Sequence, residues 1–191
     1  MKLHIGCGTI YLKEYVNIDA APHHFTHEIS KELLERNSTT LDKYYKYKFC
    51  EGPGICIADV KALADNLPYE DNTVDDIVML HVLEHIPAQE VGKVLNEFNR
   101  VLKVKGRLYL GVPDVKETAR LLAEAKTPEE EDWAIRLLHG TQRNKFSHHY
   151  CGYTERTLKK LLFQYGFTGF HLLPNINFYP AIHLEAFKEL L

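Results

Sequence analysis

KLHIGCGTIYLKEYVNIDA, residues 2–20, joins two short apolar runs through a turn that contains two glycines. The first run ends at Gly6-Cys7-Gly8, and the second ends at Asp19. A G-x-G turn after a buried strand lets the backbone approach a ligand, because glycine has no Cβ and tolerates positive φ. The stretch therefore predicts two neighbouring strands and a ligand-binding turn.

The spacing within this stretch argues against a dinucleotide. The full dinucleotide fingerprint has a third glycine three residues after the second, and an acid roughly 20 residues further on. Here Tyr11 takes the third glycine's place and Asp19 comes early. The gap is also shorter than the roughly 10–12 residues of a helical crossover, so we expect the first helix to be reduced to a turn. Asp19 can accept hydrogen bonds from both ribose hydroxyls, or it can simply cap a turn.

The rest of the chain alternates short apolar runs with longer helical patterns, which is typical of an α/β fold with a parallel sheet. We expect strands at 3–5, 15–18, 55–58, 76–80 and 107–112, and a late pair at 168–173 and 181–187. Helical spacing of apolar residues predicts helices at 28–36, 88–103, 115–125, 128–139 and 155–165.

Length and composition restrict the class of protein. The 191 residues, 45% of them hydrophobic, suit a single domain. The net charge of −3 predicts no nucleic-acid partner, and no apolar stretch approaches the ~20 residues of a membrane span. Four cysteines without a CxxC pair, and a start without a signal-peptide core, predict a cytoplasmic protein with free thiols.

Two segments do not fit the alternation. The segment 22–54 is long for a connection between strands, so we expect an insertion with its own helices that covers a sheet edge or the ligand site. Its tyrosine-lysine run, residues 44–48, is read as an exposed amphipathic face, or alternatively as a surface for stacking on bases or sugars. The segment 140–153 is polar and aromatic, and is expected to form a lid-like loop.

Polar or glycine residues follow four of the predicted strands. They are the Gly6–Gly8 turn, Asp19, Asp59 and His81. In open α/β sheets, ligands bind at the edge formed by the carboxyl ends of the parallel strands. We therefore expect these residues to share one site.

Taken together, IGCGT, VNIDA, ADVKALADNLPYEDNTVDDIVMLHVLEHIP and FNRVLKVKGRLYLGVPD resemble class I S-adenosylmethionine-dependent methyltransferases of the small methyltransferase-domain family. The resemblance spans residues 2–114 and continues weakly in HHYCGYTERTLKKLLFQYGF. It implies a Rossmann-like, mostly parallel seven-stranded sheet whose last strand is antiparallel. It also implies S-adenosylmethionine as the cofactor.

The resemblance further implies a role for each motif residue. The backbone of Gly6, Cys7 and Gly8 would line the methionine end of the cofactor, and Asp19 would hold the ribose hydroxyls. Asp59 and Val60 would flank the adenine, and His81 would present its backbone to the amino-acid moiety.

The chain also departs from the family. His4 stands where many members have an acid, and the helices that usually precede the first strand are not seen. We therefore expect the cofactor to be covered by the insertion, by the lid-like loop, or by a second subunit of a homodimer.

Methyl transfer needs alignment more than a protein nucleophile, but a general base helps a hydroxyl or amine acceptor. His85 and His149 are the predicted bases; His85 could instead bond a backbone carbonyl, and His148-His149 could lie in a solvated loop. The runs His23-His24-x-x-His27 and His148-His149-Tyr150-Cys151 lack a second ligand cluster at defined spacing, so no metal site is expected.

The leading functional hypothesis is a methyltransferase that acts on a small-molecule or sugar-derived acceptor. The first alternative is a non-catalytic nucleoside-binding scaffold of the same fold. The second, an NAD(P)-dependent oxidoreductase, is disfavoured by Tyr11 and by the early Asp19.

Overall fold

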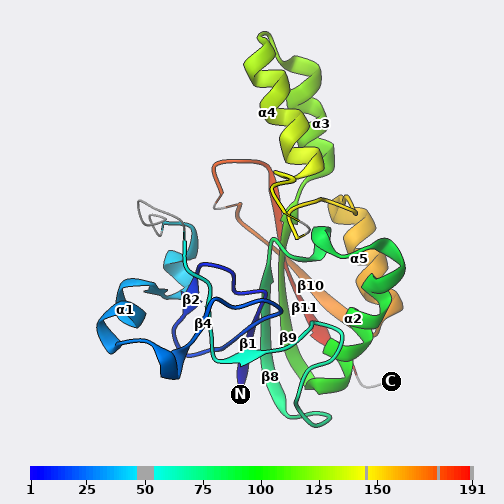
Figure 1. Ribbon diagram of the computed structural model, residues 1–191. Helices are drawn as coiled ribbons and strands as arrows, with labels where there is room; N and C mark the ends of the chain where they lie inside the picture. Colours follow the sequence, from blue (N-terminus) through cyan, green and yellow to red (C-terminus); the bar gives the residue numbers. More distant parts are fainter. Residues whose placement is uncertain (47–53, 145, 176, 190–191) are drawn as a thin grey trace.

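Seven strands form one twisted sheet at the centre of the molecule (Figure 1). The computed structural model describes residues 1–46, 54–144, 146–175 and 177–189. The strand order is β10-β11-β9-β8-β1-β3-β7. Their bounds are β1 Lys2–Ile5, β3 Val16–Asp19, β7 Val60–Lys61, β8 Val74–Leu80, β9 Leu102–Pro113, β10 Phe167–Leu173 and β11 Ala181–Lys188. Only β11 runs against its neighbours, β9 and β10, which confirms the predicted antiparallel last strand.

The other described elements surround this sheet. Short strands are β2 Tyr11–Leu12, β4 His24–Phe25, β5 Ser38–Thr39 and β6 Ile57–Ala58. The α-helices are α1 Lys31–Arg36, α2 Ala88–Val101, α3 Val115–Glu124, α4 Pro128–His139 and α5 Glu155–Gln164. Three 3₁₀ helices are η1 Thr26–Glu28, η2 Leu41–Lys46 and η3 Leu83–His85. Between β1 and β3 there is no helix, as the short gap predicted.

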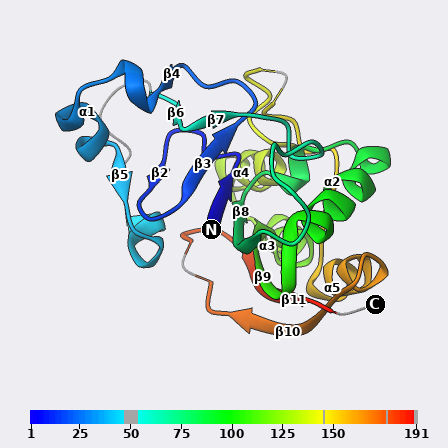
Figure 2. The ribbon, with the colours of Figure 1, turned by 90° about the horizontal axis from the view of Figure 1, so that it is seen from below.

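Helices α2 and α5 cover one face of the sheet (Figure 2). The apolar residues of α2 recur at helical spacing, so one side of the helix is buried: Val91, Val94, Leu95, Phe98 and Val101. Leu158 and Leu162 of α5 join the same core, which also holds the inward side chains of β1, β8, β9 and β11. This core fixes the positions of the strands whose ends carry the candidate site.

On the other face of the sheet, the segment 10–46 packs against β8 and β9 through a smaller apolar cluster: Ile10, Leu12 and Tyr44 with Val78, Leu80 and Tyr109. His4 of β1 is fully buried there and connects that segment to the sheet. Its Nδ1 lies 2.8 Å from Asn17 Oδ1 and its Nε2 lies 3.2 Å from Tyr44 OH. His4 is thus a buried imidazole that links β1, β3 and η2.

A hollow of about 610 Å³ remains on this face beside η2. Arg107 crosses its floor and forms ion pairs of 2.6 Å with Asp76 and 2.7 Å with Glu185. Tyr15 OH donates to Asp76 Oδ2 at 2.8 Å. These charges are paired with each other, so the hollow is lined by groups that already have protein partners.

Two predicted elements differ from the structure. The expected helix at 28–36 is divided, because Ser30 accepts from Leu33 N–H as an N-cap and α1 begins only at Lys31. The expected strand at 55–58 is not part of the main sheet. Its residues Ile57 and Ala58 pair with β4, whereas the edge strand β7 pairs Val60 with Ile18. Asp59 therefore follows a strand, as predicted, but that strand, β6, belongs to a separate two-stranded sheet, and β7 of the main sheet begins directly after Asp59.

Helices α3 and α4 pack against each other as a hairpin that projects from the sheet's upper end (Figure 1). Asp114 caps α3 and Thr127 caps α4, and Pro128 occupies the first turn of α4. Within the described ranges, no helix is both long and apolar enough to cross a bilayer.

Candidate functional site

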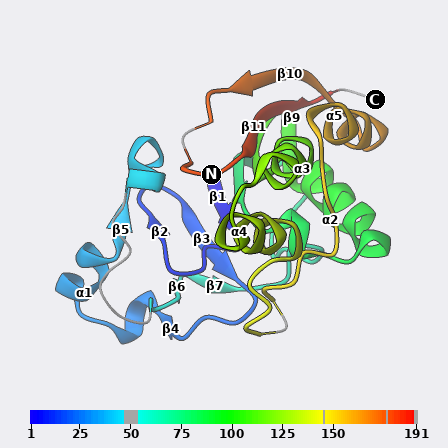
Figure 3. The same cartoon turned by 90° about the horizontal axis from the view of Figure 1, so that it is seen from above.

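The glycine turn follows β1 at the edge where the carboxyl ends of the parallel strands meet (Figure 3). Gly6 and Gly8 both have positive φ, +66° and +52°. The N–H groups of Gly6 and Cys7 donate to Ile18 O at 2.8 and 3.1 Å, and Gly8 N–H donates to Asp19 Oδ2 at 2.9 Å. These three donors are engaged within the protein, and Cys7 O accepts from Ile10 N–H at 3.0 Å, so these N–H groups do not form a phosphate-binding nest. A turn of this kind suits an ammonium group better than a pyrophosphate.

Gly6 also has no room for a side chain. A Cβ at this position would lie 2.4 Å from Val82 Cγ2, and the positive φ adds strain of about 1–2 kcal/mol. We expect Gly6→Ala to lower the free energy of unfolding by about 2–3 kcal/mol, measured by urea denaturation.

Gly8→Ala is the matched control, because its φ is also positive but its nearest contact, Gly6 O, lies 4.0 Å away. Gly8→Ala should lower the free energy of unfolding only by the strain of its positive φ. In a double-mutant cycle, Val82→Ala should recover part of the loss caused by Gly6→Ala. Equal losses for Gly6→Ala and Gly8→Ala would contradict the close approach of Val82.

Asp19 lies at the end of β3, beside the glycine turn. Its Oδ2 accepts from Gly8 N–H and its Oδ1 accepts from Ala21 N–H, both at 2.9 Å. Each carboxylate oxygen has a second lone pair, so both can still accept from a ligand hydroxyl. Asp19 thus caps a turn and also presents a fixed carboxylate at the ligand edge. The two alternatives drawn from the sequence, a turn cap and an acceptor for ribose hydroxyls, are therefore compatible.

Asp59 and Val60 lie on the neighbouring segment. Tyr11 OH donates to Asp59 Oδ1 at 2.9 Å, and Asn17 N–H donates to Asp59 Oδ2 at 2.8 Å. Asp59 N–H itself donates to Asn17 O at 2.8 Å. Asp59 therefore connects β3 to Tyr11 of β2. Its contact with an adenine stays a prediction.

Cys7 points into the protein beneath the turn. It is 2% exposed and packs with Cys56 and Ala58, and its thiol donates to Ile57 O at 3.4 Å. The neighbouring Cys56 and burial both raise the pKa of the Cys7 thiol. These contacts agree with a small residue chosen for a tight turn rather than for reactivity. Cys50 lies outside the described residues.

His81 directly follows β8 and is held in an unusual backbone conformation. Its φ is +56°, which is rare for a residue other than glycine and is found mainly where surrounding structure enforces it. His81 N–H donates to Gly111 O at 2.8 Å. Its ring lies between two elements: Nδ1 is 3.3 Å from Glu84 Oε1, and Nε2 is 2.9 Å from Asn177 Nδ2.

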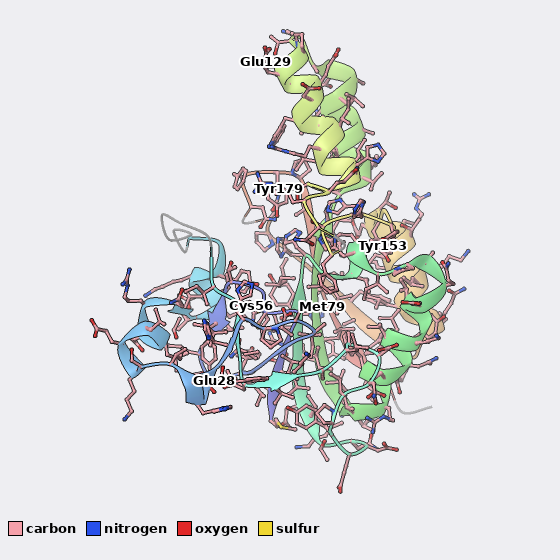
Figure 4. All side chains as sticks on the ribbon, in the orientation of Figure 1. Glu28, Cys56, Met79, Glu129, Tyr153 and Tyr179 are labelled. Carbon is pink, nitrogen blue, oxygen red and sulfur yellow. The ribbon has the colours of Figure 1, made fainter. Side chains whose placement is uncertain are left out.

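Tyr179 completes this arrangement from the loop before β11. Its OH lies 3.3 Å from His81 Nε2, and Figure 4 shows Tyr179 between the upper end of the sheet and the α3–α4 hairpin. Burial raises the pKa of Tyr179 above its usual range, so it stays a neutral phenol. The upper end of the site is therefore walled by aromatic and amide groups.

Glu84 is a buried acid within η3. It is 1% exposed. Burial opposes its charge, but His81 and His85 beside it hold the pKa of the Glu84 carboxyl below its usual value. Its backbone carbonyl accepts from Tyr150 N–H and Cys151 N–H at 2.8 and 3.2 Å. Glu84 thereby fixes the end of the 140–153 loop to η3.

This docking brings the two predicted bases together. The rings of His85 and His149 lie with centroids 4.8 Å apart. His85 Nδ1 lies 2.8 Å from His148 O, and a carbonyl oxygen can only accept, so Nδ1–H donates and Nε2 is the ring nitrogen left for another partner. Burial lowers the pKa of His149, which favours its neutral form. The neutral ring of His149 can accept a proton or bind a cation.

Sequence reasoning did not assign roles to Glu84, Asn177 and Tyr179. Glu84 could have been noticed, because a carboxylate adjacent to His85 and three residues from His81 is a compact set of polar groups. Asn177 and Tyr179 are far from the motifs in the sequence. Only the return of the chain before β11 brings them to His81.

The strand order, the antiparallel β11 and the glycine turn beside Asp19 define the Rossmann-like fold of class I methyltransferases. The family model of the methyltransferase domain matches residues 3–110, more than half of the chain. The chain therefore belongs to this family of class I, S-adenosylmethionine-dependent methyltransferases.

Solved structures show the same fold. A SAM-dependent methyltransferase from Methanosarcina mazei is 20% identical with a TM-score of 0.58, covering 99% of this chain and 92% of that one. Magnesium protoporphyrin IX methyltransferase from Synechocystis PCC 6803, solved with bound SAH, is 14% identical with a TM-score of 0.51, covering 99% and 74%. An uncharacterized protein of Methanocaldococcus jannaschii is 45% identical over 47 residues, which span 25% of this chain and 20% of that protein.

Proposed function

We propose that this protein transfers the methyl group of S-adenosylmethionine to a small-molecule or sugar-derived acceptor. The observation that carries the proposal is the pairing of the Gly6-Cys7-Gly8 turn with Asp19. The turn's N–H groups are bonded internally, and we expect its carbonyl oxygens, of which Cys7 O also accepts from Ile10 N–H at 3.0 Å, to face the cofactor's ammonium. Asp19 stands beside it with two acceptor oxygens for the ribose hydroxyls.

Each residue then contributes to positioning. Asp59 and Val60 flank the adenine and His81 lies against the amino-acid moiety. The acceptor attacks the methyl carbon in line with the C–S bond, which breaks as the new bond forms, and S-adenosylhomocysteine leaves. Holding the reactants in this geometry can supply about 7–11 kcal/mol of the barrier reduction. His85 and His149 activate the acceptor.

The surroundings of these histidines support a small, polar acceptor. Tyr179 and Asn177 line the site next to His81, and Tyr150 is 55% exposed on the neighbouring loop. Aromatic and amide side chains are suited to stacking on and hydrogen bonding a sugar or a ring. The near-neutral charge lacks the basic surface that a nucleic acid would need.

Binding of the cofactor tests the proposal first. S-adenosylhomocysteine at about 100 times its Kd should raise Tm by about 5–10 °C, and calorimetry should show one site. Transfer of a labelled methyl group to members of a metabolite panel tests catalysis. Cofactor binding without transfer to any acceptor would favour the non-catalytic scaffold. Saturable binding of NADH without binding of S-adenosylmethionine would overturn the proposal in favour of an oxidoreductase.

The setting of the activity is part of the proposal. We expect the protein to act in the cytoplasm and to bind neither a membrane nor a nucleic acid. In a homodimer, the second subunit would cover the bound cofactor. Light scattering with and without S-adenosylhomocysteine measures the oligomeric state, and a monomer in both conditions would remove this part of the proposal.

A further inference from the structure

Glu84, His85 and His149 bring one carboxylate and two imidazoles to a single point. Each offers one ligand atom, and these three atoms all lie within 4.8 Å of one another. Ligands of one Zn²⁺ at about 2.0–2.2 Å lie about 3–3.5 Å from each other, so shifts of about 1 Å would close this set around a metal. The chemistry of the set, two nitrogen atoms and one carboxylate, is common in metal sites that keep positions open for a substrate.

One oxygen of Glu84 has no hydrogen-bond partner in the described part of the chain, which favours a cation at this point. Among the residues that the structure describes, Glu84 Oε2 is buried without any hydrogen-bond partner. The carboxyl is 1% exposed, and its other oxygen, Oε1, lies 3.3 Å from His81 Nδ1. A buried polar oxygen without a hydrogen-bond partner is costly. A divalent cation at Oε2 would remove that cost.

The candidate ligands are also oriented by the groups around them. His85 donates Nδ1–H to His148 O at 2.8 Å, which leaves Nε2 as its ligand atom. His81 Nδ1 lies 3.3 Å from Glu84 Oε1, while Asn177 Nδ2 lies 2.9 Å from His81 Nε2. With Asn177 donating, His81 carries its proton on Nδ1 and directs it to Oε1. Outer partners of this kind orient the ligands in protein metal sites.

We propose that Glu84 Oε2, His85 Nε2 and one ring nitrogen of His149 bind a divalent first-row transition metal ion such as Zn²⁺, Mn²⁺ or Co²⁺. Imidazole ligands favour these ions over Mg²⁺ and Ca²⁺, which prefer oxygen. No metal was expected from the sequence, because the runs His23-His24-x-x-His27 and His148-His149-Tyr150-Cys151 lack a second ligand cluster at defined spacing. Glu84-His85 and His149 are far apart along the chain. The return of the 140–153 loop to Glu84 O brings them together.

The site also specifies the acceptor, and this step rests on the proposed function. Three protein ligands leave at least one position for an oxygen of the acceptor, so the acceptor is a hydroxyl compound. The metal ion lowers the pKa of that hydroxyl, whose proton goes to solvent. The oxygen attacks the methyl carbon, the O–C bond forms as the C–S bond breaks, and S-adenosylhomocysteine leaves. His85 and His149 thus act as metal ligands rather than as free bases.

A second cluster competes for the same kind of ion. Cys7, Asp19 and Cys56 also bring their ligand atoms within 4.8 Å of one another. There, however, the acid already accepts from Gly8 N–H and Ala21 N–H, and burial and Cys56 raise the pKa of the Cys7 thiol. A metal ligand must be the thiolate, so this cluster is the weaker candidate. The experiment below separates the two.

The test uses the full chain stripped with a chelator and titrated with Zn²⁺, Mn²⁺, Co²⁺ and Mg²⁺ by calorimetry. We expect one equivalent of a transition ion to bind, with a rise in Tm of about 5–10 °C at about 100 times Kd, and weaker binding of Mg²⁺. Glu84→Gln should weaken binding at least about 100-fold, because even outer-shell changes cost about 10–100-fold. His149→Asn should do the same, and it serves as the test if Glu84→Gln does not fold.

His27→Asn is the matched control, because His27 is exposed and belongs to the other histidine run. It should bind metal as the unaltered chain does. The Co²⁺ complex should show no thiolate-to-metal charge transfer, and Cys7→Ser should retain binding. Binding that survives both Glu84→Gln and His149→Asn, or no specific binding at all, would overturn the metal site.

The two proposals fail separately. S-adenosylhomocysteine binding is measured on the metal-free chain, and metal binding is measured without cofactor. Metal binding without any cofactor binding would contradict the proposed function but keep the site. If chelation changes neither cofactor binding nor methyl transfer, the proposed methyltransferase activity would stand, and the proposed activation of the acceptor by a metal ion would be contradicted.

Discussion

Asp19→Ala is expected to weaken binding of S-adenosylmethionine and S-adenosylhomocysteine by about 10²–10³-fold. Each hydrogen bond from a ribose hydroxyl to a charged acceptor contributes roughly 1.5–3 kcal/mol. Losing both should therefore reduce the binding free energy by about 3–4 kcal/mol. The change also removes the acceptor of Gly8 N–H, so the glycine turn loses one of its bonds. Calorimetric titration of each ligand measures the affinity.

Asp19→Asn separates these two effects. An asparagine can still accept from Gly8 N–H but carries no charge, so its affinity should lie between those of the wild type and Asp19→Ala. Glu129→Ala is the matched control, since Glu129 lies at the tip of the α3–α4 hairpin (Figure 4). It should bind both ligands normally. Unchanged affinity in Asp19→Ala would contradict the assignment of Asp19 to the ribose.

The strands of this fold follow closely from the sequence because their patterns are local. Short β-branched runs ending in glycine or polar residues marked β1, β3, β8 and β9, and the apolar spacing from Val91 to Val101 marked α2. Strand ends share one edge in a parallel sheet, so the placement of Gly6, Asp19 and His81 at that edge was also predictable. Family resemblance supplied the antiparallel β11, which local pattern alone does not reveal.

What the sequence did not show depends on contacts between distant segments. The edge strand β7 has two residues, too few for a periodic pattern, so the expected strand at 55–58 was assigned to the main sheet, whereas β7, directly after Asp59, forms its edge. The site around Glu84 needs the 140–153 loop to return to η3 and the loop before β11 to reach His81. No local pattern predicts such returns, because they are set by the packing of the whole domain.

The second large effect concerns His4 and acid. Burial lowers the pKa of His4 to about 4, although the hydrogen bond to Asn17 and the charge of Asp19 oppose this. The unfolded chain takes up the proton near pH 6.5, so between about pH 6.5 and pH 4 it binds more protons than the folded state. The contribution of neutral His4 to the free energy of unfolding is therefore complete above pH 6.5, and it is lost as the pH falls from about 6.5 toward 4. The loss at pH 4 should approach about 3 kcal/mol.

His4→Gln tests this through the slope of stability against pH, measured by urea denaturation between pH 4.5 and pH 7. A glutamine can still donate to Asn17 Oδ1 but does not titrate, so the variant is less stable at pH 7 and its stability falls less steeply toward acid. Burial and the charge of His81 also lower the pKa of His183 to about 4, so part of the slope should remain. His27→Asn is the control, with a slope like that of the wild type. A slope unchanged in His4→Gln would mean that His4 is already protonated within the fold, with Asn17, Tyr44 and Asp19 compensating a buried charge.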